Sequence, residues 1–494
     1  MKGNWQGPVV LALAAFGSLA WAVRVTPDHS CIPPPYDHGE PEKLVLVRTA
    51  SRWLHPIGDQ PVLEHQRGDG NRWVRSLPTE LHGSLPIVSL VVDPNDLFGD
   101  ESGIYTVGNA FLHDQDQVTL KYLREPRWWK YPGNYLFRGK EWERDANIEI
   151  YAPGGMLKCN DPVGVRINGN TTRGFPQKAL RISFKDDKPI HLFGSEARRY
   201  DEIVLRASGN DQDRTMFRDA LQHRLCEGMA FDVSRAQQSV VYINGAYWGI
   251  HNIRERIEDD ELAIRHGLKK KHIVILADRA LPYRNDDDGV EAKRFRSWLK
   301  RMERMTATAE ALPDSIEAII DVESFLQYMS AQIVFGNTDW PDQNVKYWRW
   351  TDEQDTTNTK TDGRWRFIMG DSDLSFGYEE IAPDKYLNMF DHLRRKQGPV
   401  ARLFKMCIAV PELKQRFDAV LRNQLAGPLS SERMEAAVLG MSNRIDAEMH
   451  RHVRRWRRPA DHGAWQAHVD AMVNFAHDRP RQVLAWWEAE RAVE

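Results

Sequence analysis

The hydrophobic pattern of the chain changes once along its length, and this change limits what the chain can fold into. Between about residues 85 and 258, short apolar runs such as VRIN, KALRISF and SVVYI are bounded by turn residues. From about residue 259 to the end, runs such as VESFLQYMSAQIVF and HVDAMVNFA repeat apolar residues at helical spacing. The first pattern is typical of strands and the second of amphipathic helices. We therefore expect an α+β protein with a β-rich first half, one central helix in it, and a mainly helical second half.

The N-terminus predicts export. Lys2 precedes a sixteen-residue apolar stretch, residues 8 to 23, which contains the small-x-small pattern Ala20-Trp21-Ala22 that signal peptidases accept. A membrane span normally needs ~20 apolar residues, which favours a cleaved signal peptide over a retained anchor. We expect a secreted, periplasmic or cell-surface protein that contacts a membrane only if this segment stays uncleaved.

The 494 residues divide into four predicted parts. Residues 1–23 form the signal peptide or N-terminal anchor, and residues 24–84 form an N-terminal region to which no role is assigned. Residues 85–258 form the β-rich part, and residues 259–494 form the mainly helical part. Two lobes in this order suit a ligand-binding cleft between them.

Local signals within these parts predict individual elements. Residues 213 to 229 place apolar side chains on one helical face, with Asp213 near the expected start of the helix. Residues 239 to 257 predict a hairpin that turns at Asn244-Gly245. His450 and His452 are two apart on a presumed helix, so they do not share a face; we expect surface histidines rather than metal ligands.

Composition excludes several classes of protein. Charged residues make up 28% and hydrophobic residues 41% of a chain with a formal net charge of −3, so we expect a folded protein that does not bind nucleic acid. The Gly-x-Ser-x-Gly, His-Glu-x-x-His and Walker motifs are missing from the sequence. Four widely spaced cysteines without a CxxC pattern argue against a zinc site and allow one or two disulfides: Cys31, Cys159, Cys226 and Cys407.

The stretch NTDWPDQNVKYWRW, residues 337 to 350, places polar residues directly before a predicted strand. Asp339 and Asn344 are five residues apart. In a kinase catalytic loop this spacing offers a base to a hydroxyl group and an amide oxygen to a magnesium ion. For Asp342, which follows a proline, we prefer a turn-forming role to a ligand role.

A second acidic pair and one lysine extend this pattern. Asp371 and Asp373 follow the strand RWRFIMG, where carboxylates could hold the metal ion that bridges nucleotide phosphates. The alternative for Asp371 is a solvated strand end. Lys178 on the strand QKALRISF, with Arg173 in the preceding loop, is the candidate cation for the phosphates. The alternative for Lys178 is to shield a sheet edge.

Several stretches together resemble the CotH family of secreted atypical protein kinases, first known from bacterial spore coats. The resemblance runs through LPIVSLVVDPNDLFGDESGIYTVGN, GKEWERDANIEIY, VRINGNTTRGFPQKALRISF, INGAYWGIHNIRERI, GNTDWPDQNVKYWRW, WRFIMGDSDLSFG and the tail FAHDRPRQV, about four fifths of the chain. The order and number of these stretches are more specific than any single motif. The resemblance implies a divergent two-lobed protein-kinase-like fold and transfer of phosphate from ATP to serine or threonine.

The resemblance also implies roles for particular residues. Asp339 matches the catalytic aspartate, and Asn344 matches the accompanying asparagine on the metal side. Asp371 matches the magnesium-binding aspartate, with Asp373 as its neighbour. Lys178 falls in the family's Pro-Lys-Lys stretch and looks like the nucleotide-binding lysine that contacts phosphate.

The sequence departs from the family pattern at two places. Gln177 replaces the first of the two lysines, and Met369-Gly370 replaces the more usual Pro-Trp before the metal aspartate. These changes leave room for a degenerate kinase. The resemblance assigns no glutamate partner to Lys178: Glu227 lies on the predicted central helix, where a kinase would place one, and Glu255 matches a frequent family position.

These observations predict an exported serine/threonine protein kinase that uses ATP with Mg²⁺ or Mn²⁺ and acts on surface or secreted proteins. One alternative is a non-catalytic structural or assembly protein of the cell surface with a degenerate kinase fold. The other is a carbohydrate-acting or adhesion protein, which export and the 17 tryptophans would suit.

Overall fold

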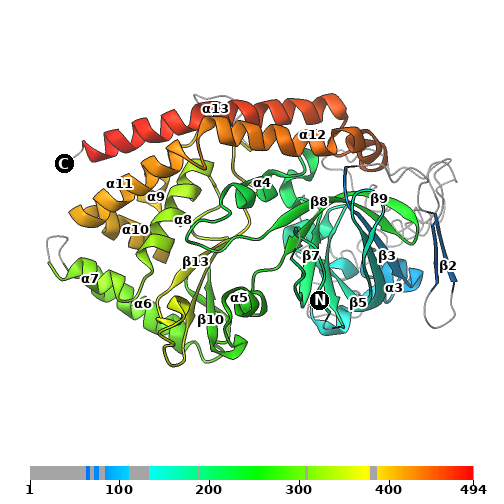
Figure 1. Ribbon diagram of the computed structural model, residues 1–494, viewed down its shortest axis with the longest axis horizontal. Coiled ribbons are helices and arrows are strands. Elements are labelled where there is room, and N and C mark those ends of the chain that lie inside the picture. The colour runs from blue at the N-terminus through cyan, green and yellow to red at the C-terminus, as the bar shows by residue number, and fades with distance from the viewer. Residues whose placement is uncertain are drawn as a thin grey trace, which may run out of the picture.

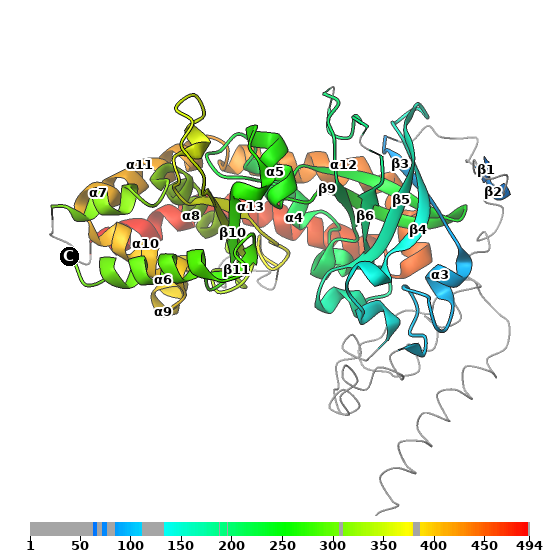
Figure 2. The same ribbon diagram turned by 90° about the horizontal axis from the view of Figure 1, so that it is seen from below.

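The computed structural model describes residues 63–66, 72–76, 84–110, 133–186, 188–194, 196–305, 310–378 and 386–492. A β-barrel lobe and a helical lobe lie side by side (Figures 1 and 2). The predicted signal peptide or anchor and most of residues 24–84 lie outside the described residues. Within that region, β1 (Leu63–Gln66) and β2 (Arg72–Ser76) form an antiparallel pair.

The first lobe is a closed barrel in which β3, β4, β5, β6, β7, β9 and β8 are neighbours in that order. The strands are β3 (Ile87–Val92), β4 (Arg144–Tyr151), β5 (Leu157–Asn168), β6 (Ala179–Phe184), β7 (Glu202–Arg206), β8 (Ala236–Ile243) and β9 (Ala246–Glu255). Neighbouring strands are antiparallel except β3 and β8, whose parallel pairing closes the barrel. The predicted hairpin is confirmed: β8 and β9 meet at Asn244-Gly245, and both turn residues have positive φ.

Short elements connect the barrel strands. They are α3 (Pro94–Phe98) and the 3-10 turns η6 (Asn134–Leu136), η7 (Lys140–Trp142), η8 (Thr171–Gly174) and η9 (Gly209–Asp213). The turn η8 lies in the loop between β5 and β6, residues 169–178, which we call the β5–β6 loop. It joins the two strands that the sequence predicted on either side of it.

The central helix is shorter than the predicted span of 213 to 229. It is α4 (Arg218–Leu225), because Met216 adopts a left-handed φ of 72° that no helix residue has. The carboxylate of Asp211 accepts hydrogen bonds from the backbone N–H groups of Phe217 and Arg218 at 3.1 and 3.0 Å. Asp211, rather than Asp213, therefore stabilises the start of this helix.

The second lobe packs helices around a four-stranded antiparallel sheet of order β11-β10-β12-β13. The strands are β10 (Ile273–Ala277), β11 (Leu281–Arg284), β12 (Val345–Trp350) and β13 (Arg366–Met369). The helices are α5 (Asp259–His266), α6 (Val290–Met302), α7 (Leu312–Glu317), α8 (Val322–Phe335), α9 (Met389–Arg395), α10 (Pro399–Ala409), α11 (Pro411–Ala426), α12 (Ser431–Trp456) and α13 (His462–Arg491), with 3-10 turns η10 (Lys270–His272) and η11 (Thr359–Thr361). The expected α+β class, with a β-rich first half and a helical second half, is confirmed.

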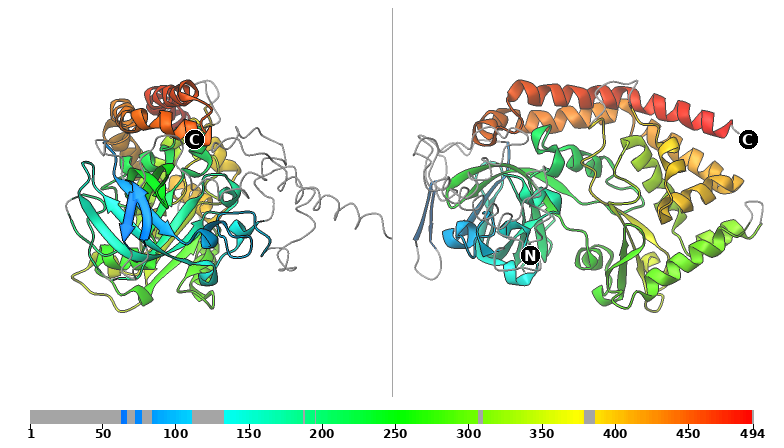
Figure 3. Two further views of the ribbon diagram at one scale, coloured as in Figure 1. Left: turned by 90° about the vertical axis from the view of Figure 1, so that its right-hand side faces the viewer. Right: turned by 180° about the vertical axis from the view of Figure 1, so that it is seen from behind.

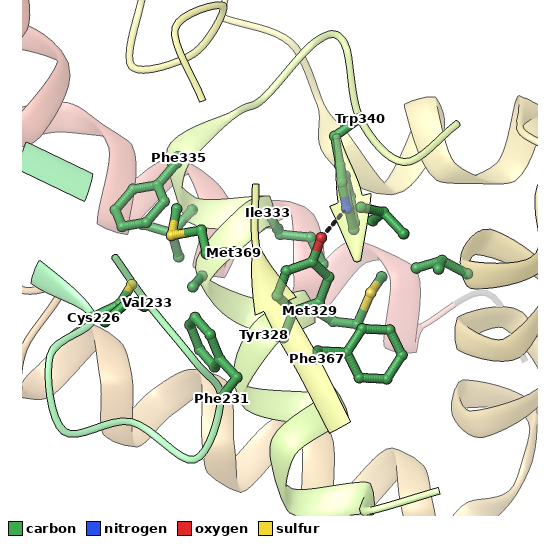
Figure 4. Close-up of a cluster of buried hydrophobic side chains, with 14 of the residues drawn as sticks. Cys226, Phe231, Val233, Tyr328, Met329, Ile333, Phe335, Trp340, Phe367 and Met369 are labelled. Atoms are coloured by element: carbon green, nitrogen blue, oxygen red, sulfur yellow. Dashed lines mark hydrogen bonds between the residues drawn. The ribbon is translucent and has the colours of Figure 1, made fainter. Parts of the chain in front are cut away.

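Helix α8 is the centre of the helical lobe. Nearly all of its side chains are buried, and they pack against β13 and the segment after α4 (Figure 4). Tyr328 on α8 accepts a hydrogen bond of 2.8 Å from the indole N–H of Trp340, just beyond the end of the helix (Figure 4). This core therefore fixes the segment that follows α8, where the sequence predicts catalytic residues.

Helix α12 joins the two lobes, running with α13 along the helical lobe until its C-terminal end reaches the barrel (Figure 3). Trp456, its last residue, packs in the barrel core and donates a 2.8 Å hydrogen bond to the carbonyl of Trp248. The expectation of a surface His452 is wrong: the side chain is fully buried, and its Nδ1 accepts a 3.0 Å hydrogen bond from the backbone N–H of Ile250. His450, two residues earlier, is exposed.

Two further expectations concern disulfides and membrane-spanning helices. Cys159, Cys226 and Cys407 are buried free thiols, so no disulfide joins any of these three; Cys31 lies outside the described residues. Among the helices that the structure describes, none is both long and apolar enough to cross a membrane.

Candidate active site between the two lobes

The loop after α8, residues 336–344, brings Asp339 and Asn344 together. The side-chain amide of Asn344 donates a 2.9 Å hydrogen bond to Oδ2 of Asp339. Asn344 has a left-handed φ of 59°, which asparagine tolerates better than most residues. The backbone N–H of Asp339 donates to Oδ1 of Asn337 at 3.3 Å. We call residues 336–344 the catalytic loop.

The loop after β13, residues 370–376, brings Asp371 and Asp373 to the same region, and we call it the metal loop. The side-chain amide of Asn337 in the catalytic loop lies 3.4 Å from the carbonyl oxygen of Asp371. Gly370 allows the two loops to approach, because a Cβ atom there would lie 2.2 Å from the carbonyl oxygen of Asn344. In this chain the packing of the two loops therefore leaves no room for a side chain at position 370.

Asp219 on α4 completes a group of three carboxylates. One oxygen from each of Asp219, Asp371 and Asp373 lies within 4.8 Å of the others, a spacing that could hold a metal ion. We call these three residues the acidic triad. Sequence analysis did not identify Asp219, although its place on the predicted central helix is where a kinase puts the partner of its phosphate-binding cation.

Arg206, the last residue of β7, is the cation at the acidic triad. Its Nη2 lies 3.0 Å from Oδ1 of Asp371 and 2.8 Å from Oδ2 of Asp373, and its Nε lies 3.5 Å from Oδ2 of Asp219. Sequence analysis did not identify this residue either. The available signal was its position at the end of a strand directly before the central helix, where protein kinases carry their lysine.

Charge and burial oppose each other within the triad. Burial alone would raise the pKa of Asp219, but Arg254 and Arg206 hold it well below its usual range. Burial, with repulsion from Asp371 and Asp219, raises the pKa of Asp373 well above its ordinary value despite Arg206. Oδ1 of Asp373 is buried and accepts no hydrogen bond from the described residues. An unpaired buried oxygen of this kind is costly unless a ligand binds it.

Asp339 responds to the same charges. Its pKa is raised, first by burial and then by the negative charge of Asp371, while the hydrogen bond from Asn344 acts in the opposite direction. A raised pKa brings a carboxylate closer to that of an effective general base. The charge of Asp371 therefore acts on Asp339, which is consistent with the contact between their two loops.

Lys178 lies apart from these residues. Its side chain is fully buried, and its ammonium group donates to the carbonyl oxygens of Arg173 and Phe175 at 2.7 and 2.8 Å. It lies 4.1 Å above the ring of Tyr135. Burial, followed by the charge of Arg173, lowers the pKa of Lys178 well below its usual range. In this structure Lys178 fixes the β5–β6 loop from within, and its predicted contact with a nucleotide stays a prediction.

Neither Glu227 nor Glu255 contacts the ammonium group of Lys178. The carboxylate of Glu255 is fully buried and forms ion pairs with Arg235, Arg265 and Arg198. Glu227 lies beyond the end of α4 and is exposed. Asp219 on the central helix instead pairs with two strand cations: Arg254 on β9 donates a hydrogen bond to it, and Nε of Arg206 on β7 lies 3.5 Å from it.

A cavity of about 380 Å³ opens beside the acidic triad. Asp371 lines it together with six arginines: Arg138, Arg166, Arg173, Arg181, Arg206 and Arg256. We call it the arginine cavity. Asn168 and Gly169 at the start of the β5–β6 loop also line it. A cavity with this wall suits an anionic group such as a phosphate chain.

Part of this positive charge has no matching carboxylate. Three of the arginines, Arg166, Arg181 and Arg256, pair with Glu202. Arg173 instead donates to the backbone carbonyls of Tyr135, Ile167 and Phe137. Its pKa is lowered to about 10, first by burial and then by neighbouring arginines. Arg173 therefore adds positive charge to the wall of the arginine cavity without a carboxylate partner among the described residues.

A second cavity, of about 530 Å³, shares Arg181, Arg256 and Tyr283 with the first. It lies between the barrel and the helical lobe, since Ser183 belongs to β6 while Tyr283 belongs to β11. Glu258, in the segment that links the lobes, also lines it. The two cavities together form a cleft that runs from the link between the lobes to Asp371.

The parts of the site follow one another in the order of a protein kinase. A loop between two strands, a strand cation, a helix carboxylate, a catalytic loop and a metal aspartate occur in turn along the chain. Fold and site therefore define a kinase-like protein. Residues 165–483 match the family described as CotH kinase protein, and the chain belongs to this family.

Comparison with other proteins adds little to this assignment. Among solved structures, the chain is similar to a chain of the HipA, HipB and operator DNA complex from the toxin–antitoxin system of Shewanella oneidensis MR-1. The identity is 13% and the TM-score 0.24, and the match covers 64% of this chain and 66% of that chain, slightly less than two thirds of its length. A likeness at this score carries no functional argument. No curated protein matches the chain.

Proposed function

We propose that this protein transfers the γ-phosphate of ATP to serine or threonine hydroxyls of surface or secreted proteins, and that it uses Mg²⁺ or Mn²⁺. The observation that carries the proposal is the meeting of the Asp339–Asn344 pair with the acidic triad beside a cavity lined by arginines. Membership of the CotH kinase family supports the same reaction class.

The residues present fit a divalent cation. Carboxylate and amide oxygens are the ligands that Mg²⁺ and Mn²⁺ prefer. Asp371, Asp373 and Asn344 would hold the ion, and Asp219 could add a further oxygen. The buried Oδ1 of Asp373, which accepts no hydrogen bond from the described residues, supports this assignment. When bound, the ion would neutralise negative charge on the phosphate oxygens.

The donor phosphates are assigned to the arginine cavity. Its wall presents guanidinium groups, which match phosphate oxygens in geometry and charge. Arg206 reaches both this cavity and the acidic triad, so it would bridge the phosphate chain and the carboxylates. Lys178 would add positive charge from behind the β5–β6 loop without touching the donor.

Asp339 would act on the acceptor. Its carboxylate would accept the proton of the serine or threonine hydroxyl while the hydroxyl oxygen forms a bond to the γ-phosphorus. The bond between that phosphorus and the bridging oxygen of ADP breaks, and ADP leaves with the electron pair. Asn344 orients Asp339 through their 2.9 Å hydrogen bond.

Export remains part of the proposal, because the apolar segment at residues 8 to 23 has the features of a signal peptide. A fusion of residues 1–30 to a reporter enzyme that works only outside the cytoplasm would test it. Reporter activity and a shortened N-terminus are expected. A reporter that stays in the cytoplasm would contradict export.

The reaction is tested with purified protein, ATP labelled at the γ-phosphate, Mg²⁺ or Mn²⁺, and casein-like acceptors. Labelled phosphoserine or phosphothreonine is expected. Asp371→Ala should abolish labelling while the protein still unfolds cooperatively, because the metal clamp supplies charge stabilisation that no other group replaces. Equal labelling by the two proteins would exclude this site.

One observation favours the non-catalytic alternative, a cell-surface structural protein with a degenerate kinase fold. Arg206 already provides a counter-ion for all three carboxylates of the triad. If Arg206 permanently replaces the metal ion, ATP with Mn²⁺ will not stabilise the protein against heat. A ligand at 100 times its dissociation constant stabilises by ~2.7 kcal/mol, which a melting experiment detects easily.

A further inference from the structure

The C-terminal stretch FAHDRPRQV, residues 475 to 483, places Arg479 deep in the helical lobe. The side chain is fully buried although it lies on α13, more than a hundred residues after the catalytic loop. Its Nη2 and Nε donate to the carbonyls of Ile333 and Val334 at 2.8 and 2.9 Å. Its Nη1 donates to the carbonyl of Leu387 at 3.0 Å.

These contacts are what the end of a helix requires. Ile333 and Val334 belong to the last turn of α8, where carbonyls lack the i+4 partner that a continuing helix would supply. The carbonyl of Ile333 also accepts a 3.3 Å hydrogen bond from the backbone N–H of Gly336, so Arg479 shares it with the helix cap. A guanidinium group there also complements the negative end of the helix dipole. Phe475 and Trp486 pack on the guanidinium group at 5.3 and 4.8 Å from their ring centres, which limits its freedom to turn away.

The end of α8 is also the point where the two loops of the active site are tied together. The backbone N–H of Phe376 donates to the carbonyl of Phe335 at 2.7 Å, and that of Thr338 donates to Leu374 at 3.0 Å. Asp339 follows Thr338 directly. A shift at the end of α8 would therefore move both the catalytic loop and the metal loop.

Leu387 extends the connection to a third segment. It precedes α9 and follows the metal loop along the chain. One guanidinium group thus links the end of α8, at the base of the catalytic loop, to the residue directly before the N-cap of α9. A lysine could not span these positions, because only the planar fork of arginine directs several N–H groups at once.

We propose that Arg479 is a positioning residue for phosphate transfer: from α13 it holds the end of α8, and so sets the placement of Asp339 relative to Asp371. Its catalytic role rests on the proposed function. The structural part does not, because it concerns the order of residues 336–344 whether or not the protein is an active kinase.

The test compares Arg479→Met and Arg479→Lys with Arg455→Met in the full chain. Arg455 is an equally buried arginine near the end of α12, where it stacks on Trp248 at 4.3 Å in the barrel lobe. It controls for the loss of any buried guanidinium group. Arg479→Lys keeps the charge without the fork and serves as the main variant if Arg479→Met does not fold.

The first readout is backbone hydrogen exchange, which needs no activity. In both Arg479 variants the amides of residues 336–344 should exchange at least about tenfold faster, while those of the barrel stay protected. Arg455→Met should leave the exchange of residues 336–344 unchanged. Unchanged exchange at residues 336–344 in a folded Arg479 variant overturns the proposal, and so does equal acceleration throughout the helical lobe.

The second readout separates binding from chemistry. Misplacement of a catalytic group by about 1 Å can cost about a hundredfold in rate, so kcat should fall tenfold to a hundredfold in Arg479→Met and less in Arg479→Lys. KM for ATP should change by less than about threefold, because the arginine cavity is untouched. A rise in KM with unchanged kcat overturns the positioning role. Absence of labelling by the unmodified protein refutes the proposed function, whereas the exchange result still decides the place of Arg479.

Discussion

Arg206 is the last residue of the strand directly before the central helix, a position where protein kinases carry a phosphate-binding lysine. An arginine at this position differs physically from a lysine. A lysine is a compact point charge, whereas the guanidinium fork of Arg206 reaches Asp371 and Asp373 from the same nitrogen while its Nε faces Asp219. Three carboxylates this close would repel one another strongly if no cation stood among them. Arg206, together with Arg254 beside Asp219, therefore offsets this repulsion before any metal ion binds.

Removing this cation should make the triad depend on metal. Loss of one partner from a buried ion pair typically costs ~3–5 kcal/mol, so Arg206→Met should unfold at a lower temperature than the unmodified protein. Mn²⁺ should then raise its melting temperature more than it raises that of the unmodified protein, because the ion replaces the lost charge. Arg206→Lys is the matched control and should lie between the two. An equal response to Mn²⁺ in all three proteins would contradict this role.

A substitution of Lys178 tests whether its side chain acts on the phosphate donor directly or only through the β5–β6 loop. Its ammonium group is enclosed by two backbone carbonyls. We therefore expect Lys178→Met to lower kcat/KM for ATP by less than about tenfold, mainly through a looser β5–β6 loop. If Lys178 instead contacted the charge that develops in the transition state, its removal would lower kcat by about 10²- to 10³-fold. Steady-state kinetics over a range of ATP concentrations distinguishes the two, and a loss in the larger range would restore Lys178 as a phosphate ligand.

At the scale of elements, features that depend on residues close together in the sequence could be predicted, and features that depend on contacts between distant segments could not. The β8–β9 hairpin was predicted because Asn244-Gly245 specifies its own turn. Asp339 and Asn344 were predicted as a pair because five residues of one loop separate them. Arg206 was not predicted, because it reaches Asp371 only after β7 and β13 come together from distant parts of the chain. No pattern in the sequence around Arg206 indicates that it will contact Asp371.

The same reasoning explains two wrong expectations. The apolar pattern of residues 213 to 229 suits a helix throughout, yet Met216 takes a left-handed conformation because Asp211 holds the next two backbone N–H groups. His452 was expected on the surface because it does not share a helix face with His450 and so is a poor metal ligand. It is buried because the end of α12 enters the barrel, a contact between elements about two hundred residues apart.

The approach of the catalytic and metal loops gives a prediction at this scale. Gly370→Ala would place a Cβ atom 2.2 Å from the carbonyl oxygen of Asn344, so the two loops must separate. Such overpacking typically costs ~1–3 kcal/mol, and here it should also lower kcat because Asp339 and Asp371 move apart. Thermal melting and the labelling assay measure the two effects.

The matched control is Gly440→Ala on α12, where a Cβ atom would meet no other atom within 4 Å. Alanine in a helix is more stable than glycine by ~1 kcal/mol, so this variant should melt slightly higher with unchanged kcat. If Gly370→Ala behaves like Gly440→Ala, the close approach of the loops does not control the site.

At the scale of the whole molecule, α12 makes the lobes one unit. Its N-terminal part packs with α13 in the helical lobe, and its last turn supplies Trp456 to the barrel core (Figure 3). Gln238 on β8 adds a 3.0 Å hydrogen bond to the carbonyl of Met441. These contacts oppose separation of the two lobes on the side of the molecule where α12 lies.

This junction should make the protein sensitive to acid. Burial lowers the pKa of His452 to about 3, with His251 and Arg455 adding repulsion, and burial lowers that of His251 to about 4. Both side chains titrate near pH 6.5 once unfolded, so below that pH the unfolded chain binds protons that the folded protein refuses. The free energy of unfolding should therefore keep its full value above about pH 7 and fall as the pH drops toward 4. At pH 5 each of the two histidines should have lowered it by ~2 kcal/mol.

Urea unfolding between pH 7 and pH 4.5 measures how steeply the free energy of unfolding falls with pH. His452→Asn keeps an acceptor for the N–H of Ile250 but cannot be protonated, so its slope should be smaller by the contribution of one histidine. His450→Asn removes an exposed imidazole from the same helix and serves as the control. Equal slopes in the two variants would show that acid acts elsewhere than at the junction of α12 with the barrel.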